Sequence, residues 1–363
     1  MNFKELQNDF KVRYNKKSSP QCVFTGYPLF LLGDITYDCE NHAILTSLSS
    51  GTALAYDKSS NNTFSVQKTT DNYLYTCPAN STSHYHKENY AKKIFNIISS
   101  FYPDLNISGL NMLFSYDIQH ESFQIHSTPL LTVLSHFMIE KKSPSQIIHS
   151  IQNLKFSPKE YAKILASIDS LKNSCIIINK NIYNYKHLPF PMHDKKIIII
   201  KTKERKQYMS LHMNNAYSDY LKFAAMNNSA SSLESDISTL PLPDKEINLL
   251  LFLLNEKKRI NKYPHITSFD DLCNIISESS QELINLTNSS DIKILNDIIT
   301  STHLPLTSRP LLDDSAFYCI VYDNDIDSFI QICEKNYEKK AGYKPTFYIC
   351  DTITGGLNLG ITH

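Results

Sequence analysis

Residues 157–201 read SPKEYAKILASIDSLKNSCIIINKNIYNYKHLPFPMHDKKIIIIK, and this stretch decides the fold class. It opens with a helix signal, because Ser157 can cap, Pro158 suits the first helical position and Glu160 can close a capping box. Two runs rich in β-branched residues follow, at residues 175–179 and 196–201, and such runs are typical of strands. A helix followed by strands predicts a mixed α/β architecture.

Helix and strand patterns continue on both sides of this stretch. Helical periodicity marks residues 90–101, 129–140 and 247–263, and strand-like runs occupy residues 316–322 and 346–350. The proline-containing segment LPFP at residues 188–191 separates two strands and is the best candidate for a domain junction. We therefore expect two domains, at residues 1–190 and 191–363.

Composition excludes several classes of protein. The chain has 363 residues, with 36 Lys+Arg against 36 Asp+Glu, so the formal net charge is zero. This balance argues against proteins that coat nucleic acid and against polybasic membrane modules. The longest apolar runs are too short to span a bilayer, and the N-terminus lacks the apolar region of a secretory signal. We expect a cytoplasmic monomer that contacts neither nucleic acid nor membrane.

The eight cysteines are scattered and form no CxxC pair. In a reducing compartment such cysteines are buried thiols, so we expect neither a disulfide framework nor a metal site.

Glycine is scarce. Average usage would give roughly 25 glycines in a chain of this length, whereas this chain has eight, and none lies between Leu110 and Ala341. Phosphate-binding loops need glycine because backbone N–H groups must approach the anion closely. No glycine-rich nucleotide loop can therefore lie in that central stretch.

Five segments, in order along the chain, resemble motifs of the galactokinases, which are members of the GHMP kinase superfamily. They are TGYPLFLLGDITYDCENHAIL at 25–45, GLNMLFSYDI at 109–118, ASIDSLKN at 166–173, SFDDLCNIISESSQELINLTNSSDIKILNDII at 268–299, and DIDSFIQICEKNYEKKAGYKPTFYICDTITGG at 325–356. The resemblance implies the two-domain GHMP kinase fold, with a sugar and ATP bound in a cleft between the domains.

The first segment resembles the family's sugar-binding motif. The resemblance implies that Gly33 is retained, that Asp34 replaces the sugar-binding Glu, and that Tyr37, with Asp38 beside it, stands at the sugar-binding Asp. The basic residue that assists transfer in the family corresponds to Pro28. Phosphoryl transfer depends on neutralising the charge of the transferred group, so this substitution removes one electrostatic contribution.

The two phosphate-binding motifs of the family have lost their glycines in this chain. In the second motif only Ser127 and Thr128 remain near the family's serines, and Glu121 adds negative charge. Ser127 and Thr128 are the candidate nucleotide-binding residues, but we favour the alternative that they cap the following helix, with Pro129 at its first position. In the third motif Asp313 and Asp314 replace glycine-loop backbone, and their carboxylates would repel phosphates.

One catalytic candidate remains. The resemblance implies that Asp169 is the base for the sugar hydroxyl. Helical spacing places Asp169 beside the apolar stripe, next to Ala162 and Ala166, where a carboxylate could face a cleft. The alternative is an ordinary helical Asp that is partly exposed.

These residues favour a non-catalytic, galactokinase-like protein, a pseudokinase that acts as a sensor, regulator or binding partner. We expect no cofactor, and a sugar or a protein as the bound partner. The alternative is a divergent ATP-dependent sugar kinase that uses Mg–ATP and Asp169. A third hypothesis is a new enzymatic activity in a remodelled cleft.

Overall fold

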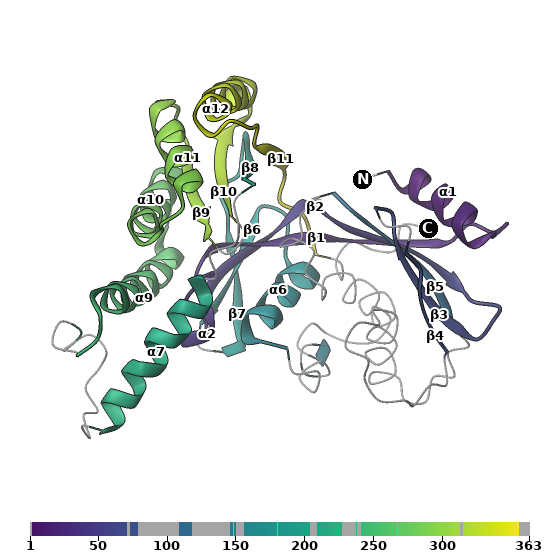
Figure 1. The fold of residues 1–363 in the computed structure, drawn as a ribbon, viewed down its shortest axis with the longest axis horizontal. Coiled ribbons are helices and arrows are strands. Elements are labelled where there is room, and N and C mark those ends of the chain that lie inside the picture. Colours follow the sequence, from purple (N-terminus) through teal and green to yellow (C-terminus); the bar gives the residue numbers. More distant parts are fainter. Residues whose placement is uncertain are drawn as a thin grey trace.

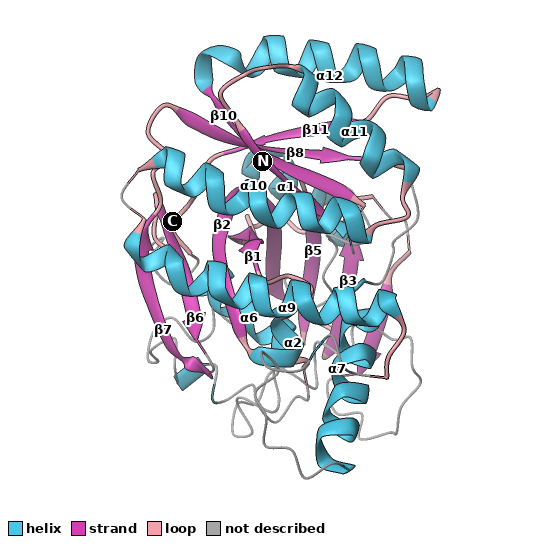
Figure 2. Cartoon of the chain, turned by 90° about the vertical axis from the view of Figure 1, so that its left-hand side faces the viewer, coloured by secondary structure: helices cyan, strands magenta, loops and turns pink. Residues whose placement is uncertain are grey.

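The structure is a computed structural model, which describes residues 2–70, 73–78, 109–117, 146–147, 149, 156–179, 181–203, 209–226, 237, 241–266, 268–312 and 315–355. The described part contains two β-sheets, with helices packed against both of them (Figure 1). The strands of the second sheet run across those of the first (Figure 2).

Seven of the described strands form the first sheet. They are β1 (Gln21–Leu32), β2 (His42–Lys58), β3 (Thr63–Lys68), β4 (Tyr75–Pro78), β5 (Leu110–Tyr116), β6 (Ser174–Asn179) and β7 (Asn181–Pro189). The strand order is β4-β3-β5-β2-β6-β7, and β1 pairs antiparallel with β2. The first half of β2 pairs with β6 and its second half with β5, so β2 links both ends of the sheet (Figure 1).

Strands β1 and β2 change register where two glycines face each other. Gly26 pairs with Gly51, and the register shifts between Gly26 and Tyr27. A Cβ on Gly51 would lie 2.0 Å from the Thr25 carbonyl oxygen, so no larger residue fits this close approach.

Among the described residues, a helix packs on each face of the first sheet. Helix α6 (Pro158–Asp169) packs on β1 and β2, and helix α1 (Phe3–Tyr14) packs on the opposite face of β2 and β5. The capping box predicted for α6 is confirmed: the Glu160 N–H donates to Ser157 Oγ at 3.2 Å, and the Ser157 N–H donates to the Glu160 carboxylate at 2.8 Å.

The second sheet has the order β11-β8-β10-β9 and is antiparallel throughout. Its strands are β8 (Lys195–Lys201), β9 (Thr307–Leu311), β10 (Ala316–Tyr322) and β11 (Thr346–Cys350). Ile198 and Ile200 of β8 face a layer of helices, whereas Ile197 and Ile199 face the first sheet. Because both faces of β8 are buried, the strand reads as an unbroken apolar run.

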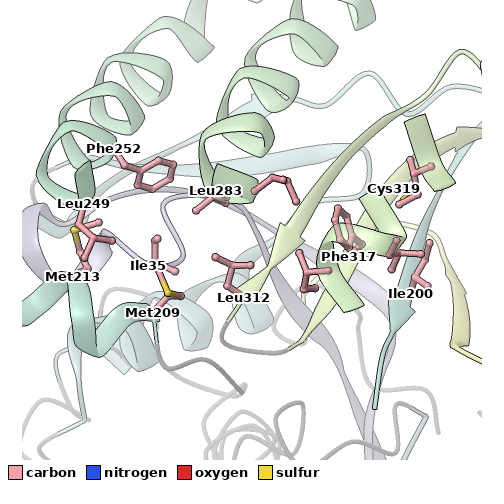
Figure 3. Packing of buried hydrophobic residues seen from close by; sticks show 14 of the residues in the cluster. Ile35, Ile200, Met209, Met213, Leu249, Phe252, Leu283, Leu312, Phe317 and Cys319 are labelled. Carbon is pink, nitrogen blue, oxygen red and sulfur yellow. The ribbon is translucent and has the colours of Figure 1, made fainter. Parts of the chain in front are cut away.

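Helices cover the outer face of the second sheet (Figure 1). The helical layer consists of α7 (Met209–Met226), α9 (Asp244–Lys262), α10 (Phe269–Leu286), α11 (Ser290–Ser301) and α12 (Ile326–Ala341), and a short 3-10 turn (Tyr263–His265) follows α9. Within this layer α9 packs on α10, and α7 packs on α9 and on the short helix α2 (Tyr37–Glu40) rather than on the second sheet (Figure 1). Figure 3 shows their core, a single cluster that includes Phe252 of α9, Leu283 of α10 and Phe317 of β10. Ile35, from the turn after β1, is buried in this same core.

A third core joins the two sheets. Leu29 and Leu31 of β1 pack against Ile197 and Ile199 of β8, and Tyr318 of β10 donates a hydrogen bond to the Leu31 carbonyl at 2.7 Å. The two sheets are therefore held together by a continuous apolar interface.

Most of the predicted elements that lie in the described residues are confirmed with small shifts of boundary. The strands expected at 175–179, 196–201, 316–322 and 346–350 are β6, β8, β10 and β11, and the helix expected at 247–263 is α9. The helices predicted at 90–101 and 129–140 lie outside the described residues. The passage from the first sheet to the second falls between β7 and β8, beside the predicted junction. None of the described helices is both long and apolar enough to cross a membrane.

Candidate functional site

The turn after β1 is held in place from the other side of the molecule. Gly33 has a φ of 87°, and a Cβ there would lie 2.5 Å from the His42 carbonyl oxygen, so this position requires glycine. The Gly33 N–H donates to Oε1 of Glu256, on α9, at 3.0 Å. The turn that carries Asp34 and leads into α2 (Tyr37–Glu40) is thus fixed to the helical layer.

Arg309 of β9 connects this turn to the second sheet. Its Nη2 lies 2.6 Å from Asp34 Oδ1 and 3.0 Å from Glu256 Oε1, and its Nε donates to Ser279 Oγ at 2.9 Å. Arg309 is fully buried, and its Nη1 has no hydrogen-bond partner among the described residues. Burial alone would lower the pKa of Arg309, but the carboxylates of Asp34 and Glu256 outweigh it and raise that pKa above its ordinary value.

The ion network continues along α9 towards α10. Arg259 Nη1 lies 3.3 Å from Glu256 Oε2, and Nη2 of the same residue pairs with Glu282. Two arginines thus share the buried carboxylate of Glu256. Charges this deep persist only when they are paired, so the network is a structural connection between the turn and the second sheet.

A small open pocket lies beside the turn. Its described lining residues are Tyr27, Pro28, Leu29, Phe30, Asp34, Lys159, Lys163 and Leu311. Most of these side chains are buried, and only Lys159 and Lys163 are half-buried. Lys159 and Lys163 are therefore the most exposed of the described lining residues.

Helix α6 presents these two lysines one turn apart. The capping box fixes the start of the helix, and residues four apart lie on one face. Lys159 Nζ lies 5.9 Å and Lys163 Nζ 6.0 Å from the centroid of the Phe30 ring, within the range of cation–π attraction. Lys159 Nζ also donates to Ser210 Oγ, on α7, at 2.9 Å.

Asp169 is the last residue of α6. It is six residues beyond Lys163, about 9 Å along the helix axis, and it is not among the described residues that line the pocket. His187 Nε2 lies 3.3 Å from Asp169 Oδ2 and 2.8 Å from the carbonyl oxygen of the same residue. Burial, with the nearby Asp169 carboxylate, raises the pKa of the Tyr185 hydroxyl above its ordinary value.

The other predicted site residues are dispersed. Tyr37 is buried in the core between the first sheet and α6, against the Phe30 ring. Asp38 accepts a hydrogen bond from the Lys159 backbone N–H at 3.0 Å, which places its carboxylate at the start of α6. Of the predicted residues that the structure describes, only Pro28 and Asp34 line the pocket.

The predicted nucleotide-binding residues Ser127 and Thr128 lie outside the described residues, as do Glu121, Asp313 and Asp314. Within the described part of the chain, no group of three or more His, Cys, Asp or Glu side chains is placed to hold a metal ion.

Sequence reasoning missed the residues that give the pocket its charge. Lys159 and Lys163 carried a usable signal, because they lie four apart in the helix that the capping box predicts. The pairs that join Arg309 to the turn carried none, since Arg309 lies 53 residues from Glu256 and 275 residues from Asp34 in the sequence.

Searches against family models and against curated proteins return no match for this chain. Solved structures do match. One is the Lactococcus lactis galactokinase complexed with galactose, with a TM-score of 0.72 and 12% identity over 97% of this chain and 98% of that chain. Another is the Methanococcus jannaschii mevalonate kinase, with a TM-score of 0.63 and 12% identity over 93% of this chain and all of that chain. The chain therefore has the fold of the GHMP sugar and metabolite kinases.

Proposed function

We propose that this protein binds a small ligand in the pocket beside Pro28 and does not transfer phosphate. One observation carries the proposal. Lys159 and Lys163 are the most exposed of the described lining residues. Asp34 also lines the pocket, but its carboxylate is already paired with Arg309. A sensor or regulator that retains the fold of a kinase without its chemistry fits this arrangement.

The chemistry of a sugar kinase makes the reason explicit. Such an enzyme orients a hydroxyl, accepts its proton and neutralises the transferred phosphoryl group. The ammonium groups of Lys159 and Lys163 can neutralise phosphoryl charge. None of the described lining residues, however, offers an unengaged carboxylate to accept the proton of the hydroxyl. Asp169, the predicted base, lies about 9 Å along α6 from Lys163 and faces His187.

Transfer by a divergent kinase is the second candidate function. One observation favours it: Asp169 is largely buried, and its carboxylate contacts an imidazole, a pairing that can hold or pass a proton. In that case Asp169 would accept the proton of a sugar hydroxyl, and Mg–ATP would be the phosphoryl donor.

A coupled assay for ADP release separates the two functions. The wild-type protein would be incubated with Mg–ATP and a panel of hexoses and amino sugars. We expect no sugar-dependent ADP release. Release that depends on a sugar and disappears in Asp169→Asn would establish the kinase and refute the non-catalytic proposal.

Ligand binding is tested separately by thermal shift, because any ligand that binds the native state alone raises the melting temperature. The variant Pro28→Arg belongs in both experiments. Restoring a cation at this position is not expected to create turnover, since a base at the pocket would still be missing.

A further inference from the structure

A second polar cluster lies at the end of α6, where the helix meets β7. Asp169 contributes its carboxylate and its backbone carbonyl from α6, and Tyr185 and His187 reach it from β7. Tyr185 and His187 lie two residues apart on the strand, so their side chains share one face of the sheet. Their rings meet edge to face, with 5.8 Å between the centroids. The cluster shares no residue with the described lining of the pocket.

The contacts of His187 Nε2 fix the position of its proton. Nε2 lies 2.8 Å from the carbonyl oxygen of Asp169 and 3.3 Å from Oδ2 of the same residue. Both oxygens are acceptors, so Nε2 is the nitrogen that carries the hydrogen and donates it. A neutral imidazole has one N–H, and its other nitrogen, Nδ1, therefore carries an unshared electron pair.

The electron pair on Nδ1 is available to a bound molecule. Nδ1 has no hydrogen-bond partner among the described residues, and 30% of the His187 side chain is exposed. The Asp169 side chain is only 11% exposed, and within the described part of the chain its sole ion-pair partner is His187. An incoming molecule therefore meets the imidazole before the carboxylate.

Asp169 supports a reactive imidazole in two ways. Its two oxygens orient the ring and hold the proton on Nε2, as acceptors do behind imidazoles that act through their other nitrogen. Its negative charge also stabilises the cationic ring that forms once Nδ1 has bonded to an electrophile. Burial, and after it the hydrogen bond and charge of Asp169, raise the pKa of the Tyr185 hydroxyl, so at neutral pH this hydroxyl stays uncharged beside the carboxylate.

We propose that His187 is a nucleophile that acts through Nδ1, positioned by Asp169, and that it hydrolyses small, uncharged, activated acyl compounds such as aryl esters. Charge selects this class of substrate, because the carboxylate 3.3 Å behind the ring repels anionic electrophiles and leaves neutral ones unaffected. The half-buried ring of Tyr185 beside the imidazole offers aromatic surface to the aryl group. This inference goes beyond the proposed function and does not depend on the ligand of the pocket.

The reaction has two steps. Nδ1 attacks the carbonyl carbon, an N–C bond forms, and the C–O bond to the phenol breaks, so that the phenolate leaves with the electron pair. Water then attacks the acyl carbon and breaks the N–C bond, which releases the carboxylic acid and restores the imidazole. The proton that water gives up passes to the phenolate, and water is the only co-reactant.

Two probes test the proposal on the full-length protein. p-Nitrophenyl acetate reports turnover, and diethyl pyrocarbonate leaves an acyl adduct on histidine that mass spectrometry can locate. We expect the wild type to release p-nitrophenolate several-fold faster than His187→Gln, and an adduct to form on His187. Asp169→Asn is expected to slow adduct formation at His187 roughly tenfold or more, because the ring loses the charge behind it.

The matched control is Asp194→Asn, which changes an exposed carboxylate that pairs with His193 Nδ1 and should leave the rate at His187 unchanged. Melting temperatures show whether each variant is folded. Nitrogen NMR of the histidine rings in the wild type tests the position of the proton without any substitution, and we expect the Nε2–H form of His187.

Four results would overturn the proposal. They are an Nδ1–H form of neutral His187, the absence of an adduct on His187 while His193 reacts, equal release of p-nitrophenolate by the wild type and His187→Gln, and an unchanged rate at His187 in Asp169→Asn. Sugar-dependent ADP release would refute the non-catalytic function instead, and it would leave these four measurements unaffected.

Discussion

Arg309 Nη2 lies 2.6 Å from Asp34 Oδ1, so an ion pair joins the second sheet to the turn after β1 across 275 residues of sequence. Both side chains are buried, and the same guanidinium also contacts Glu256. The position that resembles a sugar-binding residue is therefore part of a structural network in this protein.

Replacing Arg309 is expected to destabilise the protein strongly. In Arg309→Met the carboxylates of Asp34 and Glu256 lose a shared partner in a buried environment. Removing one partner of a buried pair costs about 3–5 kcal/mol of unfolding free energy. Urea unfolding followed by circular dichroism measures the change.

The matched control is Lys222→Met, which removes an exposed pair with Asp219 on α7. It should change the unfolding free energy by less than about 1 kcal/mol. A similar loss of unfolding free energy in Arg309→Met and Lys222→Met would contradict a structural role for Arg309.

Loss of the capping box is expected to weaken α6. Ser157→Ala removes the acceptor of the Glu160 N–H and should cost about 1 kcal/mol of unfolding free energy. Thr300→Ala, which removes an exposed hydroxyl that bonds within α11, should leave the unfolding free energy nearly unchanged. Urea unfolding of the two variants and the wild type measures the difference, and equal losses in both variants would contradict a special role for the capping box.

Alkaline pH is expected to lower stability through buried thiols. Burial raises the pKa of Cys175 from 9.0 to about 12. The unfolded state therefore loses this proton first, and the stabilisation that is complete below pH 9 is lost as the pH rises towards 12. Each such thiol contributes a slope of about 1.4 kcal/mol per pH unit.

Urea unfolding of the wild type and of Cys175→Ala above pH 9 isolates this contribution. The variant should show a shallower decline of unfolding free energy with pH, whatever its stability at neutral pH. Identical slopes in the two proteins would show that Cys175 is not buried as described.

Mg–ATP is expected to leave the melting temperature unchanged. A triphosphate needs several converging backbone N–H donors, and the chain has no glycine between Leu110 and Ala341 to provide such a loop. A ligand at a hundred times its dissociation constant would stabilise the protein by about 2.7 kcal/mol, which thermal shift detects easily. A clear rise in melting temperature with Mg–ATP, reversed by EDTA, would contradict this prediction.

Local signals in the sequence predicted the elements well. The capping box at Ser157 and the run of isoleucines in β8 depend only on neighbouring residues, and both have the predicted structure. The GHMP kinase fold was also expected, and the structural neighbours support it.

The site was harder to predict for a geometric reason. Each residue of a helix advances about 1.5 Å and turns about 100°, so a shift of six residues moves a side chain from the pocket to the far end of α6. Motif comparison selected Asp169, whereas the pocket contains Lys163. The partners of Asp34 are Arg309 of β9 and Ser210 of α7, and no pattern near Asp34 in the sequence indicates them.

The apolar interface between the two sheets has a kinetic consequence. Leu29 and Leu31 pack against β8, and Ile35 lies within the helical core, so the two halves cannot swing apart without exposing apolar surface to water. Large apolar interfaces of this kind suppress hinge motion. A ligand would therefore meet a preformed site, and its association should follow a single exponential whose rate rises linearly with ligand concentration.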